Sequence, residues 1–482
     1  MITCPPNLSD QLTDDLRQQH IVIQQLQSQL DRFGYAQVDT PLIEEADSFL
    51  IKAGDAAISR LVTFDLPGST LCLRPEFTVP AARVYIEHFQ THQGPVRLQF
   101  AGPILQYGNL GHNHLRQQNA VGAELLDEYG PAADAEIIAL AARMLLETGA
   151  AHWQLIIGHS GLIERFLDRY ALNRQMHRFV LEWLPQLHAG QDGLERARAA
   201  LEQMHDSTRA ASLGLPDDLH DTETALQAML QAAPQRGPLA GRSREDIARR
   251  LLSKQQQGDQ FQKAMQALQD FSQMLTHAHS PSALLAHIHD TPMKRPAREL
   301  METFELLNAY QLPAEQVTFD LSFTRNLDYY TGIVFEYRSQ DPAAVLLGGG
   351  GRYDELVRLL GASRDVPAVG FMLYVDSILQ ARPDAPTVSH TPITHLLIVG
   401  EKPEQAAALI PLATRLREAG FTVTASLQGN QSPAPLTGSQ YTHMVTLQPP
   451  DSLVIHELDT AKKHHIPLGD FESLRQLLEA EK

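Results

Sequence analysis

Residues Phe323 to Tyr337, with the sequence FTRNLDYYTGIVFEY, place an arginine, a carboxylate and two adjacent tyrosines in one strand-like segment. An arginine that is removed from water needs an anionic partner, so Arg325 indicates a ligand with a negative group. Tyr329 and Tyr330 are adjacent, and neighbouring strand residues point to opposite faces, so only one of them is expected to line a pocket directly. Core packing accounts for one tyrosine, but not for the charged residues beside it. The segment therefore predicts a polar ligand site.

A second group of polar side chains lies in LRPEFT, residues Leu73 to Thr78. The Glu76 carboxylate could bind a ligand ammonium, with the Thr78 hydroxyl nearby. The alternative is a solvated strand end with a salt bridge, because isolated charged residues usually lie on the surface. The residues themselves leave both interpretations open.

Four consecutive glycines, Gly348 to Gly351, precede RYDEL. Glycine allows close approach of a backbone to a ligand, and it equally allows a tight turn. A phosphate-binding P-loop is excluded because no G-K-[S/T] sequence follows.

The 21 histidines include pairs two residues apart, such as His277 and His279, a spacing that does not place both side chains on one helix face. Two cysteines are too few for a zinc cluster or a disulfide framework and indicate a reducing, cytoplasmic location. No apolar run reaches membrane-spanning length, so no membrane association is expected. The sequence predicts no metal and no cofactor.

The 482-residue length predicts two or three domains, and the net charge of −18 argues against tRNA as a partner, since no basic run is present. Strand-like and helix-like segments alternate in an α+β pattern, interrupted by a long helical stretch. A proline-rich linker is expected at residues 381–392. We predict an antiparallel sheet core, a helical insertion and a small C-terminal α/β domain, at residues 1–164 with 313–382, 165–312 and 393–482 respectively.

Taken in order, these motifs resemble the histidyl-tRNA synthetase family. The segment YAQVDTPLIEE with its preceding helix is similar to the family's first class II motif. LRPEFT, QQNAVGAE, RNLDYYTGIVFE and GGGGRYDEL are similar to its histidine-binding segments. The resemblance spans most of residues 9–382 and implies a class II aminoacyl-tRNA synthetase-like antiparallel sheet. The C-terminal domain resembles a shortened anticodon-binding domain.

The resemblance also implies roles for individual residues in binding L-histidine. Glu76 and Thr78 would hold the ligand amino group, and Arg325 would lie near its carboxylate. Glu124 and Tyr330 would face the imidazole, with Tyr329 beside them. The family has a glutamine at the position of Ala120, so one contact to the amino group is missing here.

The nucleotide half departs from the family pattern. Gln106 stands where the family has an arginine that grips the α-phosphate of ATP and the amino-acid carboxylate. A second basic residue falls at about His114, although Arg116 follows two residues later. In FMLYVDSIL, Tyr374 replaces a glycine and Ser377 replaces an arginine. Losing one transition-state contact costs roughly 100- to 1000-fold in rate, so the resemblance implies histidine binding without activation.

A kept ligand site without activation chemistry resembles the regulatory subunits of ATP phosphoribosyltransferase, which are paralogues of the synthetases, and LIIGHSGLIERFL (Leu155 to Leu167) is similar to the same group. The expected partner is the short-form catalytic subunit, with this chain forming a homodimer through residues 26–43. The expected function is feedback regulation of the first step of histidine biosynthesis. Two alternatives stay open, a true histidyl-tRNA synthetase and another synthetase-like paralogue with a different partner.

Overall fold

The computed structural model describes residues 4–479 apart from 52–60, 108–114, 151, 212–243, 290, 326–328, 341–343, 383–394, 401, 403–404, 427–440, 449, 459 and 461. The chain forms two compact units, one of residues 23–381 with 5–8 and one of residues 382–482 with 1–4 and 9–22. The first helix, α1 (Thr13–Arg32), belongs partly to each unit. Most of the expected linker at 381–392 lies outside the described residues.

The larger unit is built on an eight-stranded sheet with the order β1-β5-β6-β11-β10-β9-β7-β8. Its neighbours pair antiparallel except at the two edges, where β1 is parallel to β5 and β8 is parallel to β7. The predicted antiparallel sheet core is confirmed. The strands are β1 (Ala36–Gln37), β5 (Val96–Tyr107), β6 (Leu115–Leu126), β7 (Trp153–His159), β8 (Val317–Phe319), β9 (Ile333–Ser339), β10 (Leu346–Arg352) and β11 (Ala368–Tyr374).

The four glycines lie within β10, so of the two interpretations left open by the sequence, close backbone approach and a tight turn, the structure excludes the turn. Each is pressed against a neighbour: a Cβ on Gly350 would lie 1.8 Å from the Gly370 carbonyl oxygen, and one on Gly349 would lie 2.1 Å from an Arg325 guanidinium nitrogen. The run of glycines therefore brings β10 close to β11 and makes room for Arg325.

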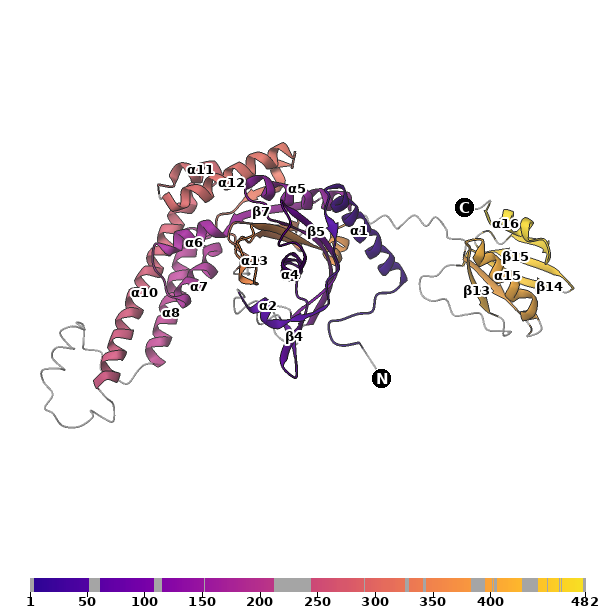
Figure 1. The fold of residues 1–482 in the computed structure, drawn as a ribbon, viewed down its shortest axis with the longest axis horizontal. Helices are drawn as coiled ribbons and strands as arrows, with labels where there is room; N and C mark the ends of the chain where they lie inside the picture. The colour runs from indigo at the N-terminus through magenta and orange to yellow at the C-terminus, as the bar shows by residue number, and fades with distance from the viewer. Residues whose placement is uncertain are drawn as a thin grey trace. The chain divides into compact units, whose positions relative to one another are not determined.

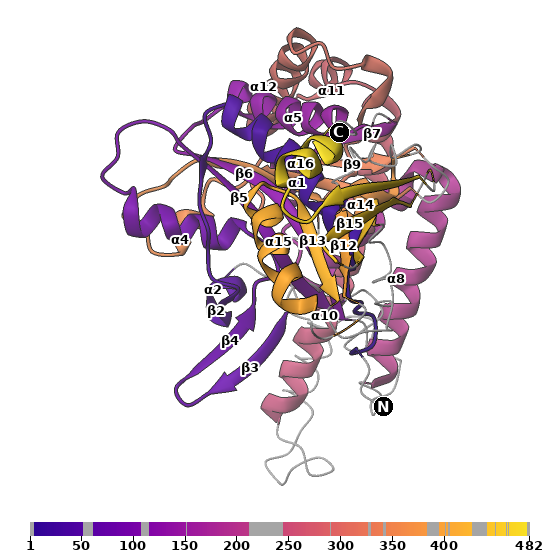
Figure 2. The same cartoon turned by 90° about the vertical axis from the view of Figure 1, so that its right-hand side faces the viewer.

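Helices complete the larger unit. The apolar helix α5 (Pro131–Glu147) packs on β6, β10 and β11, while α4 (Thr78–His88) contributes to a cluster of buried apolar residues with α13 (Leu356–Leu359). A small three-stranded sheet lies beside α2, and Figure 2 shows its hairpin projecting away from the large sheet. These elements are β2 (Ile43–Glu45), α2 (Ala46–Leu50), β3 (Val62–Leu66) and β4 (Ser69–Leu73). The helix α14 (Val375–Gln380) instead contacts β6, β10 and β11 of the large sheet.

Two segments differ from the sequence-based expectation in the same region. In YAQVDTPLIEE we expected a strand that ends at Pro41; the structure has the short strand β1 before Pro41 and a second one, β2, after it, and the two pair in different sheets. LRPEFT is not a continuous strand, because β4 ends at Leu73 and α4 begins at Thr78. Pro67 and Gly68 form the turn between β3 and β4, as the Pro-Gly pair predicts.

Helices fill the described part of the segment predicted as a helical insertion. Figure 1 shows α8 and α10 running side by side away from the sheet. The two helices contact each other, both contact η1, and α10 also contacts α7. The helix α12 instead packs on α5 and α6. The elements are α6 (Ser160–Asp168), α7 (Arg174–Trp183), η1 (Leu184–Ala189), α8 (Gln191–Ala211), α10 (Arg244–His277), α11 (Pro281–His287), α12 (Thr291–Ala309) and η2 (Ala314–Gln316).

The C-terminal part has a five-stranded sheet with the order β13-β12-β14-β15-β16 and its own apolar core. β12 is parallel to β13 and β14, so the predicted β-α-β arrangement is confirmed. No helix among the described residues combines the length and apolar character that crossing a membrane requires. The elements are β12 (His395–Val399), α15 (Ala406–Glu418), β13 (Thr422–Ser426), β14 (His443–Gln448), β15 (Ser452–Glu457), β16 (Lys463–Pro467) and α16 (Phe471–Glu479).

Candidate functional site

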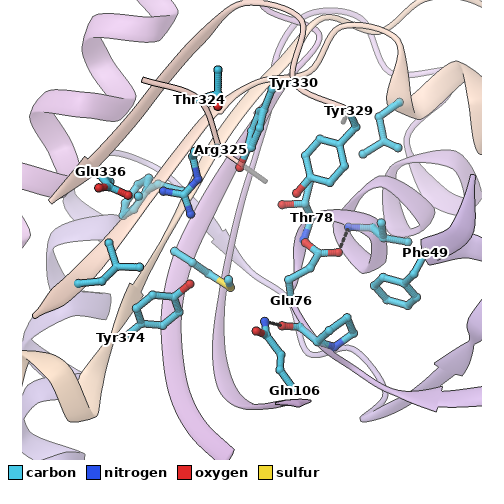
Figure 3. A pocket seen from close by; sticks show the side chains of 18 of the residues that line it. Phe49, Glu76, Thr78, Gln106, Thr324, Arg325, Tyr329, Tyr330, Glu336 and Tyr374 are labelled. Atoms are coloured by element: carbon cyan, nitrogen blue, oxygen red, sulfur yellow. Dashed lines mark hydrogen bonds between the residues drawn. The ribbon is translucent and has the colours of Figure 1, made fainter. Parts of the chain in front are cut away.

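A cavity of about 640 Å³ opens against β9, β10 and β11 in the larger unit. It is large enough for a small polar metabolite. Five of the six residues predicted to bind a ligand line it: Glu76, Thr78, Arg325, Tyr329 and Tyr330. In Figure 3, Arg325, Glu336 and Tyr374 lie on one side, Glu76, Thr78 and Tyr329 on the other, and Gln106 at one end. The cavity thus separates a cationic group from a carboxylate.

Arg325 holds its place through one described hydrogen bond, in which a guanidinium nitrogen donates to the Phe335 carbonyl oxygen over 3.0 Å. No described carboxylate lies within ion-pair distance of it. Burial opposes its charge, yet the tyrosines around it, led by Tyr330 and Tyr374, and Glu336 raise the Arg325 pKa. No described residue accepts from its other N–H groups, so the side chain is a charged donor at the cavity, where an anionic ligand group fits.

Glu76 is buried and lies just before α4. Its two carboxyl oxygens accept hydrogen bonds from the backbone N–H groups of Thr78 and Val79, over 2.5 and 3.1 Å. Burial raises the Glu76 pKa, while these two bonds lower it. Glu76 thus satisfies donors at the start of α4, a structural duty that the sequence did not indicate, and its remaining lone pairs are available to a ligand ammonium.

Glu124, on β6, is the sixth predicted residue, and it lies one layer behind the cavity surface. One of its oxygens accepts from the Thr78 hydroxyl over 2.7 Å and the other from the Tyr353 hydroxyl over 2.6 Å. Gly370 separates it from the cavity, since a Cβ there would lie 1.5 Å from a Glu124 oxygen. Burial raises the Glu124 pKa to about 8. Glu124 therefore contacts the cavity lining through Thr78, and it lies directly behind Gly370, which has no side chain to cover it.

The expectation that only one of the two tyrosines lines the pocket is wrong. Tyr329 and Tyr330 precede β9 rather than lying in a strand, so the alternation of strand side chains does not apply to them. Both line the cavity, with their ring centroids 4.8 Å apart. Burial raises the Tyr330 pKa to about 12, so its hydroxyl stays protonated. Together the rings form an apolar wall with hydroxyl groups at its edge.

The residues at the positions of the expected nucleotide site, Gln106, Tyr374 and Ser377, are held by contacts within the protein. The Gln106 amide donates to the Pro75 carbonyl oxygen over 2.6 Å. Tyr374 lines the cavity and packs against a buried apolar cluster that includes Ala120, its partner across β11 and β6. Ser377 is buried in α14, away from the described lining of the cavity.

Of the remaining basic candidates, His114 lies outside the described residues. Arg116 is exposed on β6, directly opposite Gln106 in the ladder, and is not among the described residues that line the cavity.

Three residues of the site, Glu336, Arg338 and Tyr353, were not predicted from the sequence. Glu336 is bonded to the Arg338 guanidinium, and both line the cavity beside Arg325. Tyr353 orients Glu124 from beneath. Alternation along β9 could have placed Glu336 and Arg338 on one face, but the contact from Tyr353 to Glu124 joins residues 229 positions apart.

Comparison with known proteins gives concordant results. The family model described as histidyl-tRNA synthetase matches residues 7–245 and 239–378. The ATP phosphoribosyltransferase regulatory subunit of Mesorhizobium japonicum is 32% identical over 369 residues, covering 72% of this chain and 94% of its own. The histidine–tRNA ligase of Pyrococcus furiosus is 24% identical over 431 residues, covering 88% of this chain and 85% of its own.

Solved structures resemble the fold. A protein from Bacillus halodurans, described as an ATP phosphoribosyltransferase regulatory subunit/histidyl-tRNA synthetase, aligns with a TM-score of 0.64 at 21% identity, covering 92% of this chain and 98% of that one. Apo histidyl-tRNA synthetase of S. aureus aligns with a TM-score of 0.60 at 19% identity over the full length of both chains. At these identities the likeness concerns the class II synthetase-like fold alone.

Proposed function

The chain belongs to the histidyl-tRNA synthetase family, among its ATP phosphoribosyltransferase regulatory subunits, and from that premise we propose that its cavity binds free L-histidine and reports it to a catalytic partner. The partner is a short-form ATP phosphoribosyltransferase catalytic subunit. The observation that carries the proposal is the contrast within one cavity, in which Arg325 and Glu76 remain available to a ligand while Gln106 is bonded to the protein itself.

The charge arrangement suits a zwitterionic amino acid. Arg325 offers guanidinium N–H groups for the ligand carboxylate, and the Glu76 carboxylate with the Thr78 hydroxyl lies across the cavity for the ammonium group. Glu124, behind Thr78, is a buried acceptor or donor for the imidazole at the depth where Gly370 leaves space. Tyr329 and Tyr330 provide the flat apolar surface that an imidazole ring packs against.

The same cavity gives no support for adenylate formation. Gln106 and Ser377 carry no charge for a phosphate, and Tyr374 fills the edge where the family has glycine. We predict that histidine-dependent pyrophosphate exchange stays at background. A clear exchange rate that survives repurification would favour the synthetase alternative. The match to the histidine–tRNA ligase of Pyrococcus furiosus, which covers 88% of this chain, is the reason to test it.

The regulatory proposal is tested by co-expressing this chain with a short catalytic subunit, purifying the complex and measuring phosphoribosyl transfer with and without histidine. Histidine must favour one state of the complex, and coupling of about 1–3 kcal/mol corresponds to roughly 5- to 150-fold. The Arg325→Ala variant is expected to assemble but not to respond to histidine, and Arg325→Lys, which keeps the charge without the planar fork, to respond weakly.

Failure of the two chains to associate would favour a different partner. Normal inhibition of the Arg325→Ala complex would place the histidine site elsewhere.

Self-association is part of the proposal, through a surface that retains only the end of the segment expected at residues 26–43, namely Leu42 and Ile43. Leu30 is fully buried within the larger unit, so it contributes nothing to an interface. The exposed apolar residues lie instead on the small sheet and α2, with Leu42, Ile43, Leu50, Ile51, Phe64 and Leu66 between 37% and 51% exposed. We propose that this surface joins two copies of the chain. Light scattering that shows a monomer at micromolar concentration would contradict it.

A further inference from the structure

The helical insertion reaches the large cavity through its short helix η1. Pro185 of η1 lines that cavity, as do residues 323–325. Side chains three residues apart in a 3₁₀-helix lie above one another, so His188 is on the same side of η1 as Pro185. Leu184 and Leu187, also three residues apart, are buried. The helix therefore packs through its leucines and presents Pro185 and His188 together.

His188 is paired with the start of the segment that carries Arg325. Its Nε2 lies 2.8 Å from Asp320 Oδ1 and 2.8 Å from Ser322 Oγ. The Ser322 hydroxyl and backbone N–H both donate to the same Asp320 oxygen, over 2.7 and 2.8 Å. Because the hydroxyl proton is used on Asp320, the His188 Nε2–H is the donor to both oxygens. The pair thus joins the insertion to a segment 132 positions away.

That segment is itself fixed on the large sheet. The Asp320 backbone N–H donates to the Ile157 carbonyl oxygen of β7 over 2.9 Å. A Cβ on Gly158 would lie 2.4 Å from the Phe323 carbonyl oxygen and 3.0 Å from the Asp320 carbonyl oxygen, so the segment lies against β7 only because residue 158 is glycine. His188 therefore ties η1 to an anchored part of the cavity wall.

The pair is charged as well as hydrogen-bonded. The hydrogen bond to Asp320 raises the His188 pKa above its ordinary value of 6.5, although burial opposes this. Burial raises the Asp320 pKa, but the hydrogen bonds from His188 and Ser322 outweigh it and lower the pKa overall. Folding thus favours protonated His188, whose stabilising contribution is full below pH 6.5 and is lost as pH rises through the raised pKa.

The other charged groups around η1 have no comparable effect. The helices in contact with η1 are α7, α8 and α10, and they carry charged side chains such as Glu182, Asp192 and Lys263. Among the described residues, Asp320 is nevertheless the one charged group that acts on the His188 pKa. The charge of His188 therefore reports on its contact with the cavity segment.

We propose that His188 is a positioning residue for the large cavity: through Asp320 and Ser322 it holds η1, and with it the Pro185 wall, beside the segment that carries Arg325, so that ligand binding weakens as pH rises. The inference rests on the proposed function, since it concerns the same cavity and the same ligand. The His188 side chain is 51% exposed, so the pair is worth only about a threefold change.

The first experiment needs no ligand. Hydrogen–deuterium exchange is compared, at pH 6 and at pH 8.5, between the full wild-type chain and His188→Gln, which keeps an amide donor but carries no charge. Peptides that cover η1 and residues 317–325 should exchange about threefold faster in the variant at pH 6 and equally at pH 8.5. Comparing two proteins at one pH removes the intrinsic pH dependence of exchange. Equal exchange at both pH values would overturn the proposal.

The second experiment titrates L-histidine by calorimetry at the same two pH values. Between pH 6 and pH 8.5 the wild type should lose about threefold more affinity than His188→Gln. The ligand imidazole and Glu124 titrate in both proteins, so only the difference counts. Equal losses would mean that the pair is merely structural, and the proposal would be wrong. The matched control is His177→Gln, which removes another histidine–carboxylate pair of the insertion, with Glu164 over 3.0 Å and outside the described cavity lining; it should behave like the wild type.

A variant of the partner separates charge from hydrogen bonding. Asp320→Asn keeps an acceptor for His188 and Ser322 but removes the charge, so it should reproduce the His188→Gln result, and the double variant should be no worse than either single one. Additive losses would overturn the proposal. If the exchange difference is present but the wild type takes up no histidine at either pH, the proposed function fails while the role of His188 in holding η1 stands.

Discussion

The two halves of the large cavity differ in how their polar side chains are satisfied. In the ligand half, Arg325 bonds only one backbone carbonyl among the described residues, and Glu76 keeps lone pairs facing the cavity. The other half, around Gln106 and Tyr374, corresponds to the family's nucleotide site and is called the nucleotide half below. There Gln106 is bonded to Pro75, and Tyr374 packs on an apolar cluster. The proposed function requires this difference, because only the first half has to take up a ligand.

The comparison teaches that unmet hydrogen-bonding capacity, rather than the presence of a cavity, marks where a ligand binds. Burying a charged group without a partner costs several kcal/mol, so an arginine such as Arg325 is stable only where a ligand or water completes its bonds. Gln106 needs no ligand, because the chain already supplies its acceptor. The predictions below alter one half at a time.

The largest effect is expected from Gly370→Ala. The new Cβ would lie 1.5 Å from a Glu124 oxygen and 2.7 Å from the Ala123 carbonyl oxygen, so the buried carboxyl must move. Overpacking of this kind costs about 1–3 kcal/mol in unfolding free energy. Histidine affinity should fall by more than about 100-fold, because Glu124 and Thr78 shift together. Calorimetry and denaturant unfolding measure the two effects.

The matched control for that substitution is Gly469→Ala, where a Cβ meets no atom within 4 Å. It should leave histidine affinity and the stability of the larger unit unchanged. Wild-type histidine affinity in Gly370→Ala would mean that Glu124 has no role in the ligand half.

Glu124→Ala is expected to weaken histidine binding by about 100-fold. Removing the Glu124 carboxyl leaves the Thr78 and Tyr353 hydroxyls without their partner, and a buried polar group without a partner costs about 1–3 kcal/mol. Glu124→Gln is the isosteric control: it still accepts from Thr78 but cannot accept from Tyr353 with its amide nitrogen. An intermediate loss is expected for it by titration. Equal affinities in wild type and Glu124→Ala would move the imidazole site away from β6.

A smaller effect concerns pH. The Glu124 pKa is about 8 in the folded protein, against an ordinary value of 4.5, because burial disfavours the carboxylate. The protonated group is therefore favoured by folding, and its stabilising contribution, full below about pH 4.5, is lost as pH rises through 8. Glu124→Gln cannot ionise, so the unliganded variant should lose less stability than wild type between pH 6 and pH 9. Denaturant unfolding at both values measures this, and identical losses would refute it.

Sequence reasoning predicted the elements better than the depth of the site residues. The strands β5, β6 and β7 and the helix α5 follow the alternating α+β pattern that the sequence predicted for this part of the chain. The site residues were found through the family resemblance. It could not show that Glu124 lies behind Gly370, since that depends on contacts between distant segments. The positions of Tyr329 and Tyr330 were wrong for a local reason, because β9 begins three residues after Tyr330.

The smallest change is expected when the nucleotide half is partly restored. Gln106→Arg returns the family's arginine to a position opposite Arg116 in the β5–β6 ladder and removes the bond to Pro75. The lost bond should cost about 1 kcal/mol of stability. Histidine affinity should stay within about twofold of wild type, because the ligand half is untouched. Pyrophosphate exchange should remain at background, since Tyr374 still fills the cavity edge and Ser377 offers no charge. Measurable exchange in Gln106→Arg, absent from wild type, would mean that one side chain alone separates the two halves, and that the nucleotide half is open after all.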